Sequence, residues 1–265
     1  MVGKTVAALA LLAVATQAAF NPDMEKPVTA QDRCTTIVVG AKAGSTGPMN
    51  TQTADCSDCD FRISKVPARD WPEGTMRPLY VIKNNYPAVI SENRGNTWKP
   101  SNLHGSPSQL AAWGTESPTT AYIPQVNHTY ALFEAGYGIM NEFQVALGES
   151  TCPARFWAAP TIAGGQARIE MSEMSKIALE RAKTAREAIQ VMGDMAVTYG
   201  FYAADWSGGD ESKGEGGEAM TVIDKTEAWI FHVTGDDTGT SAVWVARRVP
   251  DGHVRFFCLL TKANN

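Results

Sequence analysis

Short apolar runs separated by polar, glycine-containing segments make up most of the chain, and this pattern predicts β-strands. The first run, Cys34–Val39, is β-branched and ends at Gly40, so it predicts a buried strand that begins at Cys34. The polar, glycine-rich stretch that follows through Asp60 predicts a loop. Further short strands are predicted at Leu79–Lys83, Ala88–Ser91, Thr129–Ala135 and Gly138–Gly148, the last with a turn at Asn141 and Glu142.

Two helices are predicted in the second half of the chain. Apolar residues recur at spacings of three and four between Met171 and Ala182, which is the period of a helix with one buried face. A capping box from Thr184 to Glu187 begins a second helix, and Gly200 ends it. The methionines on these helices are expected to pack in the core and not to form a cofactor or partner surface.

The last third of the chain returns to strands. A polar segment at Ser207–Gly217 predicts a surface loop. Strands are then expected at Glu218–Asp224 and Glu227–Val233, joined by a hairpin about Lys225, and at Thr240–Val249 and Val254–Leu260. The order of strands, helices and strands predicts an α+β fold in which sheets and helices form separate layers.

The N-terminus has the features of a secretory signal peptide over residues 1–18. Lys4 precedes the apolar run Val6–Ala15, and small residues follow at the expected cleavage site. An N-terminal buried or amphipathic helix is the alternative. The run is shorter than the roughly 20 residues that span a bilayer, so no stable membrane insertion is expected. Residues 19–33 are interpreted as a pro-segment, and the protein is expected to be secreted or to lie in an endomembrane or lysosomal lumen.

Composition narrows the classes of partner. The 265 residues include 28 acidic and 23 basic side chains, which gives a formal net charge of −5. Nucleic acid is therefore excluded as the main partner, because phosphate binding needs clustered lysine and arginine. The triplet that begins at Asn127 is an N-glycosylation sequon, which fits a secreted protein. The sequence does not indicate the oligomeric state.

Several kinds of catalytic site are disfavoured. The four histidines lie far apart and form no zinc-ligand pair, and the chain has no Gly-x-Ser-x-Gly motif, so no metal or other cofactor is expected. The five cysteines are an odd number, which leaves at least one thiol unpaired in an oxidising compartment. They are Cys34, Cys56, Cys59, Cys152 and Cys258.

Cys34 is the cysteine with the strongest case for chemistry. If the chain is cut between Arg33 and Cys34, the thiol becomes a nucleophile and the new α-amino group, with a pKa of about 7.7–8.0, becomes its general base. No histidine is needed for this arrangement. From these features alone, a buried structural cysteine is the alternative.

Several motifs spread along the chain match one known family. They are Asp32–Gly40, Thr53–Arg62, Lys65–Ala68, Trp71–Gly74, Ile123–Val126, His128–Tyr130, Gly138–Glu142, Gly148–Trp157, Thr184–Ala188, Asp237–Ser241 and Val249–Pro250. With these motifs the chain resembles the cysteine dipeptidases of the dipeptidase A and secernin group, which are N-terminal nucleophile (Ntn) hydrolases. This resemblance implies an Ntn-hydrolase domain over residues 34–254 with an αββα four-layer sandwich, and it implies hydrolysis of dipeptides or small peptides.

The resemblance also assigns roles to individual residues. Cys34 matches the nucleophile, and Asp55 matches the acidic residue that holds the nucleophile's amine as a base. Asn141 or Ser150 is a candidate oxyanion donor, although each is equally well explained as a structural residue. Candidate substrate-carboxylate ligands are Arg62 and Arg94, with exposed ion pairing as the alternative.

The chain departs from this group at two places. Gln52 stands where the group commonly has histidine. The resemblance stops near Val254, so residues 255–265 are interpreted as a divergent tail and the sandwich is expected to be incomplete at its C-terminus. Two other functions remain open: an Ntn amidase or acylase that cleaves N-acyl substrates, and a secernin-like protein or truncated form without activity.

Overall fold

The computed structural model describes residues 33–55, 63–80, 119–152, 154, 156–203 and 216–258. The predicted signal peptide and pro-segment lie outside these ranges, apart from the backbone of Arg33. So do Ala88–Ser91 and nearly all of the polar segment before Gly217. No helix of the described ranges is both long and apolar enough to cross a membrane.

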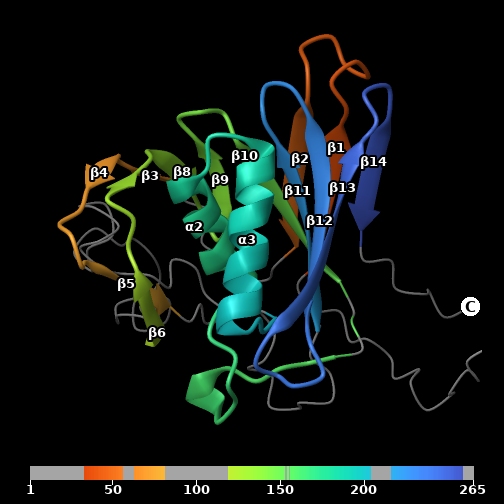
Figure 1. Ribbon diagram of the computed structural model, residues 1–265. Coiled ribbons are helices and arrows are strands. Elements are labelled where there is room, and N and C mark those ends of the chain that lie inside the picture. The colour runs from red at the N-terminus through yellow and green to blue at the C-terminus, as the bar shows by residue number, and fades with distance from the viewer. Residues whose placement is uncertain are drawn as a thin grey trace, which may run out of the picture.

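Most of the described strands form two antiparallel sheets (Figure 1). The smaller sheet has the order β14-β1-β2, and the larger has the order β13-β12-β11-β10-β9-β8-β3. Two further strand pairs, β4-β7 and β5-β6, stand apart from them. The strands are β1 (Arg33–Val39), β2 (Met49–Asp55), β3 (Ser64–Val66), β4 (Arg69–Asp70), β5 (Met76–Tyr80), β6 (Thr119–Pro124), β7 (His128–Thr129), β8 (Leu132–Glu134), β9 (Gly138–Asn141), β10 (Ala146–Cys152), β11 (Gly217–Ile223), β12 (Ala228–Gly235), β13 (Ala242–Val249) and β14 (Val254–Cys258).

Both predicted helices are confirmed as α2 (Met171–Arg181) and α3 (Ala185–Tyr199). Thr184 is the N-cap of α3, since its side chain accepts a hydrogen bond from the backbone N–H of Glu187. Gly200 ends α3 with a φ of 72°, a conformation that favours glycine. A short 3-10 helix, η5, spans Thr161–Ala163.

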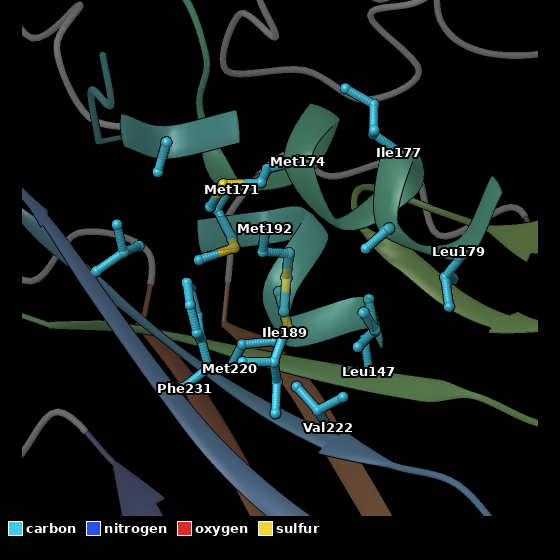
Figure 2. Packing of buried hydrophobic residues seen from close by; sticks show 14 of the residues in the cluster. Leu147, Met171, Met174, Ile177, Leu179, Ile189, Met192, Met220, Val222 and Phe231 are labelled. Carbon is cyan, nitrogen blue, oxygen red and sulfur yellow. The ribbon is translucent and has the colours of Figure 1, made fainter. Parts of the chain in front are cut away.

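The helices and the two sheets form three layers (Figure 1). Helices α2 and α3 cover one face of the larger sheet, while β1 and β2 lie against β10 and β11 on its other face. The main core fills the space between helices and sheet, and it contains Met174 and Met192 of the helices together with Phe231 and Val222 of the sheet (Figure 2). These layers are compatible with the expected α+β class. The second helix layer of a four-layer sandwich is not part of the described residues.

A smaller core joins the two sheets and contains Val38, Ala146 and Ile230. The outer face of the smaller sheet carries apolar side chains that the described residues leave open to solvent. Met49 is 41% exposed, Val254 is 51% exposed and Phe256 is 58% exposed.

The strand predictions are partly wrong. The stretch after Gly40 was expected to be a loop, but it contains the full strand β2, which pairs with β1 along its whole length. Thr129–Ala135 was expected to be one strand and is instead divided between β7 and β8. The turn at Asn141 and the hairpin about Lys225 are confirmed, because β9 and β10 flank the first and β11 and β12 flank the second.

Candidate functional site

Cys34 lies near the start of β1, the central strand of the smaller sheet. Its side chain is 7% exposed and faces the larger sheet, as do Thr36 and Val38 on the same strand. In the pairing of β1 with β2, Cys34 is opposite Ala54 and Arg33 is opposite Asp55. The backbone of Asp55 therefore lies beside the peptide bond that precedes Cys34.

Ser150 ties Cys34 to the larger sheet. The Ser150 hydroxyl, which is buried on β10, donates a hydrogen bond of 2.9 Å to the backbone carbonyl of Cys34. Because a hydroxyl has a single hydrogen to donate, this bond uses the donor that an oxyanion would need. The structure thus favours the structural role for Ser150, as an anchor for the start of β1.

Within the described residues, the edge of strand β10 next to Cys34 has no strand partner beyond Ala146. The strand pairs with β11 over its whole length, but with β9 only at Ala146, opposite Met140. At Glu149, the side chain of Gln52 makes the hydrogen bond to the β10 backbone that a neighbouring strand would otherwise make. Gln52 of β2 accepts a hydrogen bond of 3.0 Å from the backbone N–H of Glu149, and its amide nitrogen donates one of 3.1 Å to the Glu149 carboxylate. Gln52 thus satisfies an edge N–H and holds the side chain of the same residue.

The Glu149 carboxyl group is the centre of a buried polar cluster. It is fully buried and accepts a hydrogen bond of 3.1 Å from the Thr151 hydroxyl. Burial raises its pKa, and side-chain hydrogen bonds with Glu218, Cys34, Thr151 and Tyr137 act in the opposite direction. A carboxyl group is therefore in hydrogen-bond contact with the candidate nucleophile.

Tyr137 and Glu170 extend this cluster towards helix α2. Burial, followed by the nearby charges of Glu149 and Glu218, raises the pKa of Tyr137 well above its usual value. Glu170 is the N-cap of α2, where its two oxygens accept the backbone N–H groups of Ser172 at 2.8 Å and Glu173 at 2.9 Å. Burial raises the pKa of Glu170 to about 7 despite these two bonds.

A buried ion pair holds the other face of α2. Arg77 of β5 donates to Glu173 at 2.7 Å and to Glu180 at 2.8 and 2.9 Å. Burial lowers the pKa of Arg77, but the charges of Glu180 and Glu173 outweigh that effect and raise it. The guanidinium is therefore charged and joins β5 to the helix whose N-cap borders the cluster.

The hydrogen bonds of Asn141 favour the structural alternative over the predicted role as oxyanion donor. Its amide group donates to the carbonyls of Leu179 at 3.0 Å and Ala182 at 2.7 Å. Its oxygen accepts from the N–H groups of Phe143 at 3.0 Å and Val145 at 3.1 Å. All four of its hydrogen-bonding positions are occupied, because the residue links the β9-β10 turn to the end of α2.

Most of the other predicted residues lie outside the part of the chain that the structure describes. Arg62 and Arg94, with Cys56 and Cys59, lie outside the described residues, as do the side chains of Asp55 and Cys258. Cys152 is half-buried on β10, and its thiol lies 3.7 Å from the carbonyl oxygen of Ser150. The sequon residue Asn127 is exposed, and the Thr129 hydroxyl of the same sequon accepts a hydrogen bond of 2.9 Å from the Trp71 indole.

Glu149 and Tyr137 were not found from the sequence, and Gln52 was noticed only as a departure from the resembled group. No local pattern marks the contact between Gln52 and Glu149, because the two residues are 97 positions apart in the sequence and meet only where β2 lies beside β10. In the ranges that the structure describes, no group of three or more His, Cys, Asp or Glu side chains is arranged to hold a metal ion.

One comparison with known proteins bears on this site. The model of a family described as peptidase family C69 matches residues 118–264, which is more than half of the chain. The matched segment contains β10, both helices and β14, and it extends across the segment that the sequence analysis set apart as a tail. Cys34 itself lies outside the match. The pairing of β1 with β14 and the bond from Ser150 join it to the matched segment.

Proposed function

The chain belongs to peptidase family C69, and we propose on this basis that it is a cysteine-type dipeptidase whose nucleophile is the Cys34 thiol. The observation that carries the proposal is the position of Cys34. It is a buried thiol on the central strand of the smaller sheet, in hydrogen-bond contact with Glu149 and anchored by Ser150 of the family segment. The predicted role of Cys34 and the family of the chain thus lead to the same chemistry.

In the proposed reaction, removal of the residues before Cys34 frees its α-amino group. That amine takes the proton of the thiol as the sulfur attacks the carbonyl carbon of the first substrate residue. A carbon–sulfur bond forms, the carbon–nitrogen bond breaks, and the leaving amine receives the proton. The product of this half-reaction is a thioester.

Water completes the cycle. The amine of Cys34 removes a proton from water, the resulting hydroxide attacks the thioester, and the carbon–sulfur bond breaks to release the acid and regenerate the thiol. All atoms and protons balance without a metal or cofactor.

Asp55 is proposed to hold the amine of Cys34 as a base. The pairing of Asp55 with Arg33 supports this role, because the amine would appear at the same end of the β1-β2 pair. Arg62 and Arg94 remain proposed ligands of the substrate carboxylate, since a guanidinium binds a carboxylate with two parallel hydrogen bonds. Secretion through a signal peptide over residues 1–18 and loss of residues 19–33 are part of the same proposal.

Cysteine variants test the nucleophile. With a panel of dipeptides, Cys34→Ala and Cys34→Ser are expected to lower kcat at least about 1,000-fold, because each removes the covalent route. Cys152→Ala is the matched control, since it removes another thiol of the same sheet pair, and it is expected to keep full activity. Equal activity of Cys34→Ala and the unaltered protein would show that the nucleophile is another group.

The substrate class is tested in the same assay. A dipeptidase cleaves the dipeptides and leaves N-acyl amines intact, whereas an Ntn amidase shows the reverse preference. A protein that cleaves neither after exposure of Cys34 as the N-terminus has a role outside catalysis.

A further inference from the structure

We infer that Glu149 is a positioning residue for Cys34: before the reaction its carboxylate accepts the hydrogen bond of the thiol and fixes the position of the sulfur, and the thiol proton passes to the amine only as the sulfur attacks. The inference rests on the proposed function, because that function gives the direction of the sulfur its meaning. It begins from the place of Glu149 beside Cys34: Ser150, the next residue of β10, bonds the Cys34 carbonyl at 2.9 Å, both Glu149 and Cys34 are buried, and the Cys34 thiol is a hydrogen-bond partner of the Glu149 carboxyl group.

Glu149 is suited to this role because its own position is fixed. Its backbone belongs to β10, which pairs with β11 along the whole strand. One carboxyl oxygen receives the amide of Gln52 at 3.1 Å and the other receives the hydroxyl of Thr151 at 3.1 Å. A carboxylate held at both oxygens cannot rotate freely, so the acceptor that it presents to the thiol has a fixed position.

Burial strengthens the contact. Glu149 is 0% exposed and Cys34 is 7% exposed, so water does not compete for the thiol hydrogen as it would at a surface. Hydrogen bonds in such a low-dielectric environment are stronger than in water. The Ser150 bond to the Cys34 carbonyl fixes the backbone of the same residue, so β10 holds Cys34 at two points.

The charge state of Glu149 depends on the groups around it. Those that face it are Cys34 from β1, Glu218 from β11 and Tyr137 ahead of β9, with neutral Gln52 from β2 and Thr151 on its own strand. Glu170, ahead of α2, acts on Tyr137. Because burial raises the pKa of Glu149, its ionised form is lost as the pH falls, from a higher pH than for an exposed glutamate.

Removal of the Glu149 charge should make the Cys34 thiol ionise more easily and should at the same time slow turnover. A neighbouring negative charge disfavours the thiolate, so Glu149→Gln is expected to lower the pH midpoint of Cys34 alkylation by iodoacetamide by about one unit. The same variant is expected to lower kcat for a dipeptide roughly 10–100-fold, with KM changed less than about 3-fold, because the sulfur is misdirected. A purely structural contribution would not lower the alkylation midpoint.

Matched variants complete the experiment on the full chain. Glu149→Asp keeps the charge and should keep the alkylation midpoint while recovering part of kcat. Glu180→Gln changes a buried glutamate that pairs with Arg77, and it should leave the midpoint unchanged. If Glu149→Gln does not fold, Thr151→Val removes only one bond to the carboxylate and is expected to lower kcat about 2–10-fold.

The outcomes separate this inference from the proposed function. An alkylation midpoint and kcat that Glu149→Gln leaves unchanged would overturn the inference while the Cys34 variants still support the function. Dipeptide cleavage that survives Cys34→Ala would overturn the function, whereas the alkylation midpoint would still report on the contact between Glu149 and the thiol.

Discussion

Substitution of Gly148 by alanine tests how closely the two sheets approach each other at Thr36, two residues after Cys34 on β1. A Cβ atom at this position of β10 would lie 2.8 Å from the Thr221 hydroxyl, 2.9 Å from the Thr36 hydroxyl and 3.1 Å from the Thr51 carbonyl oxygen. These separations are shorter than ordinary van der Waals contacts of about 3.4 Å or more. Alanine therefore fits only if the neighbouring strands move.

The neighbours of Gly148 have little freedom to move. The hydroxyl oxygens of Thr36 and Thr221 lie 2.9 Å apart, and the carbonyl oxygen of Thr51 lies 2.7 Å from the first and that of Gly148 lies 3.0 Å from the second. The two hydroxyl hydrogens serve two of these three close contacts, and all three hold the strands together at this point. Overpacking of a filled core costs about 1–3 kcal/mol. Each buried hydrogen bond that is stretched adds roughly 1 kcal/mol. We expect Gly148→Ala to lower the free energy of unfolding by about 3 kcal/mol.

Urea unfolding followed by far-UV circular dichroism measures this loss. Gly252→Ala is the matched control, because a Cβ there meets no atom within 4 Å, and its free energy of unfolding should stay within about 0.5 kcal/mol of the unaltered protein. A loss below about 0.5 kcal/mol for Gly148→Ala would refute the close approach of the sheets. Because Thr36 is two residues from Cys34 on the same face of β1, we also expect kcat to fall.

Two further predictions concern the buried polar contacts of α2. Arg77→Met leaves Glu173 and Glu180 buried without their cation and should lower the free energy of unfolding by about 3–5 kcal/mol near pH 8. In this variant, burial without a cation raises the pKa of both carboxyl groups, so they bind protons as the pH falls towards 5. The loss of unfolding free energy should therefore be smaller near pH 5 than near pH 8. Equal losses in urea unfolding at the two pH values would contradict this. Asn141→Leu removes four hydrogen bonds and should cost at least about 2 kcal/mol in thermal unfolding, whereas Asn127→Ala, at an exposed site, should cost nothing measurable.

The helices could be predicted from the sequence because their apolar residues follow the helical period. The sequence could not show which residues surround the polar faces of these helices. The polar residues Glu173 and Glu180 of α2 are typical of a solvent-facing surface, yet both are buried because Arg77 of a distant strand pairs with them. Periodicity shows which side chains share a face and does not show what covers it.

Strand β2 was missed for a different physical reason. Its sequence from Met49 to Asp55 is polar and rich in threonine, so it lacks the apolar signal of a buried strand. The strand forms because β1 offers an antiparallel partner along its whole length, and its inward side chains make hydrogen bonds in place of apolar contacts. Non-local pairing of this kind also creates the cluster of Glu149 and Gln52, which single residues in a sequence cannot reveal.

Cys34 could be proposed from the sequence as a candidate nucleophile because it is a cysteine at the start of a buried strand after a polar segment, and because the resemblance to the cysteine dipeptidases favoured this role over a structural one. Its contacts with Ser150 and Glu149 could not, because they depend on how two sheets meet. The sequence was therefore informative about the candidate nucleophile and silent about the residues that contact it.

N-terminal sequencing of the active protein tests the central claim most directly, when it is combined with mass spectrometry of the acid-quenched enzyme during dipeptide turnover. The account predicts that the active chain begins at Cys34 and that its N-terminal peptide carries one acyl group as a thioester. An active chain that begins at residue 19, with full activity and an unmodified Cys34, would contradict it.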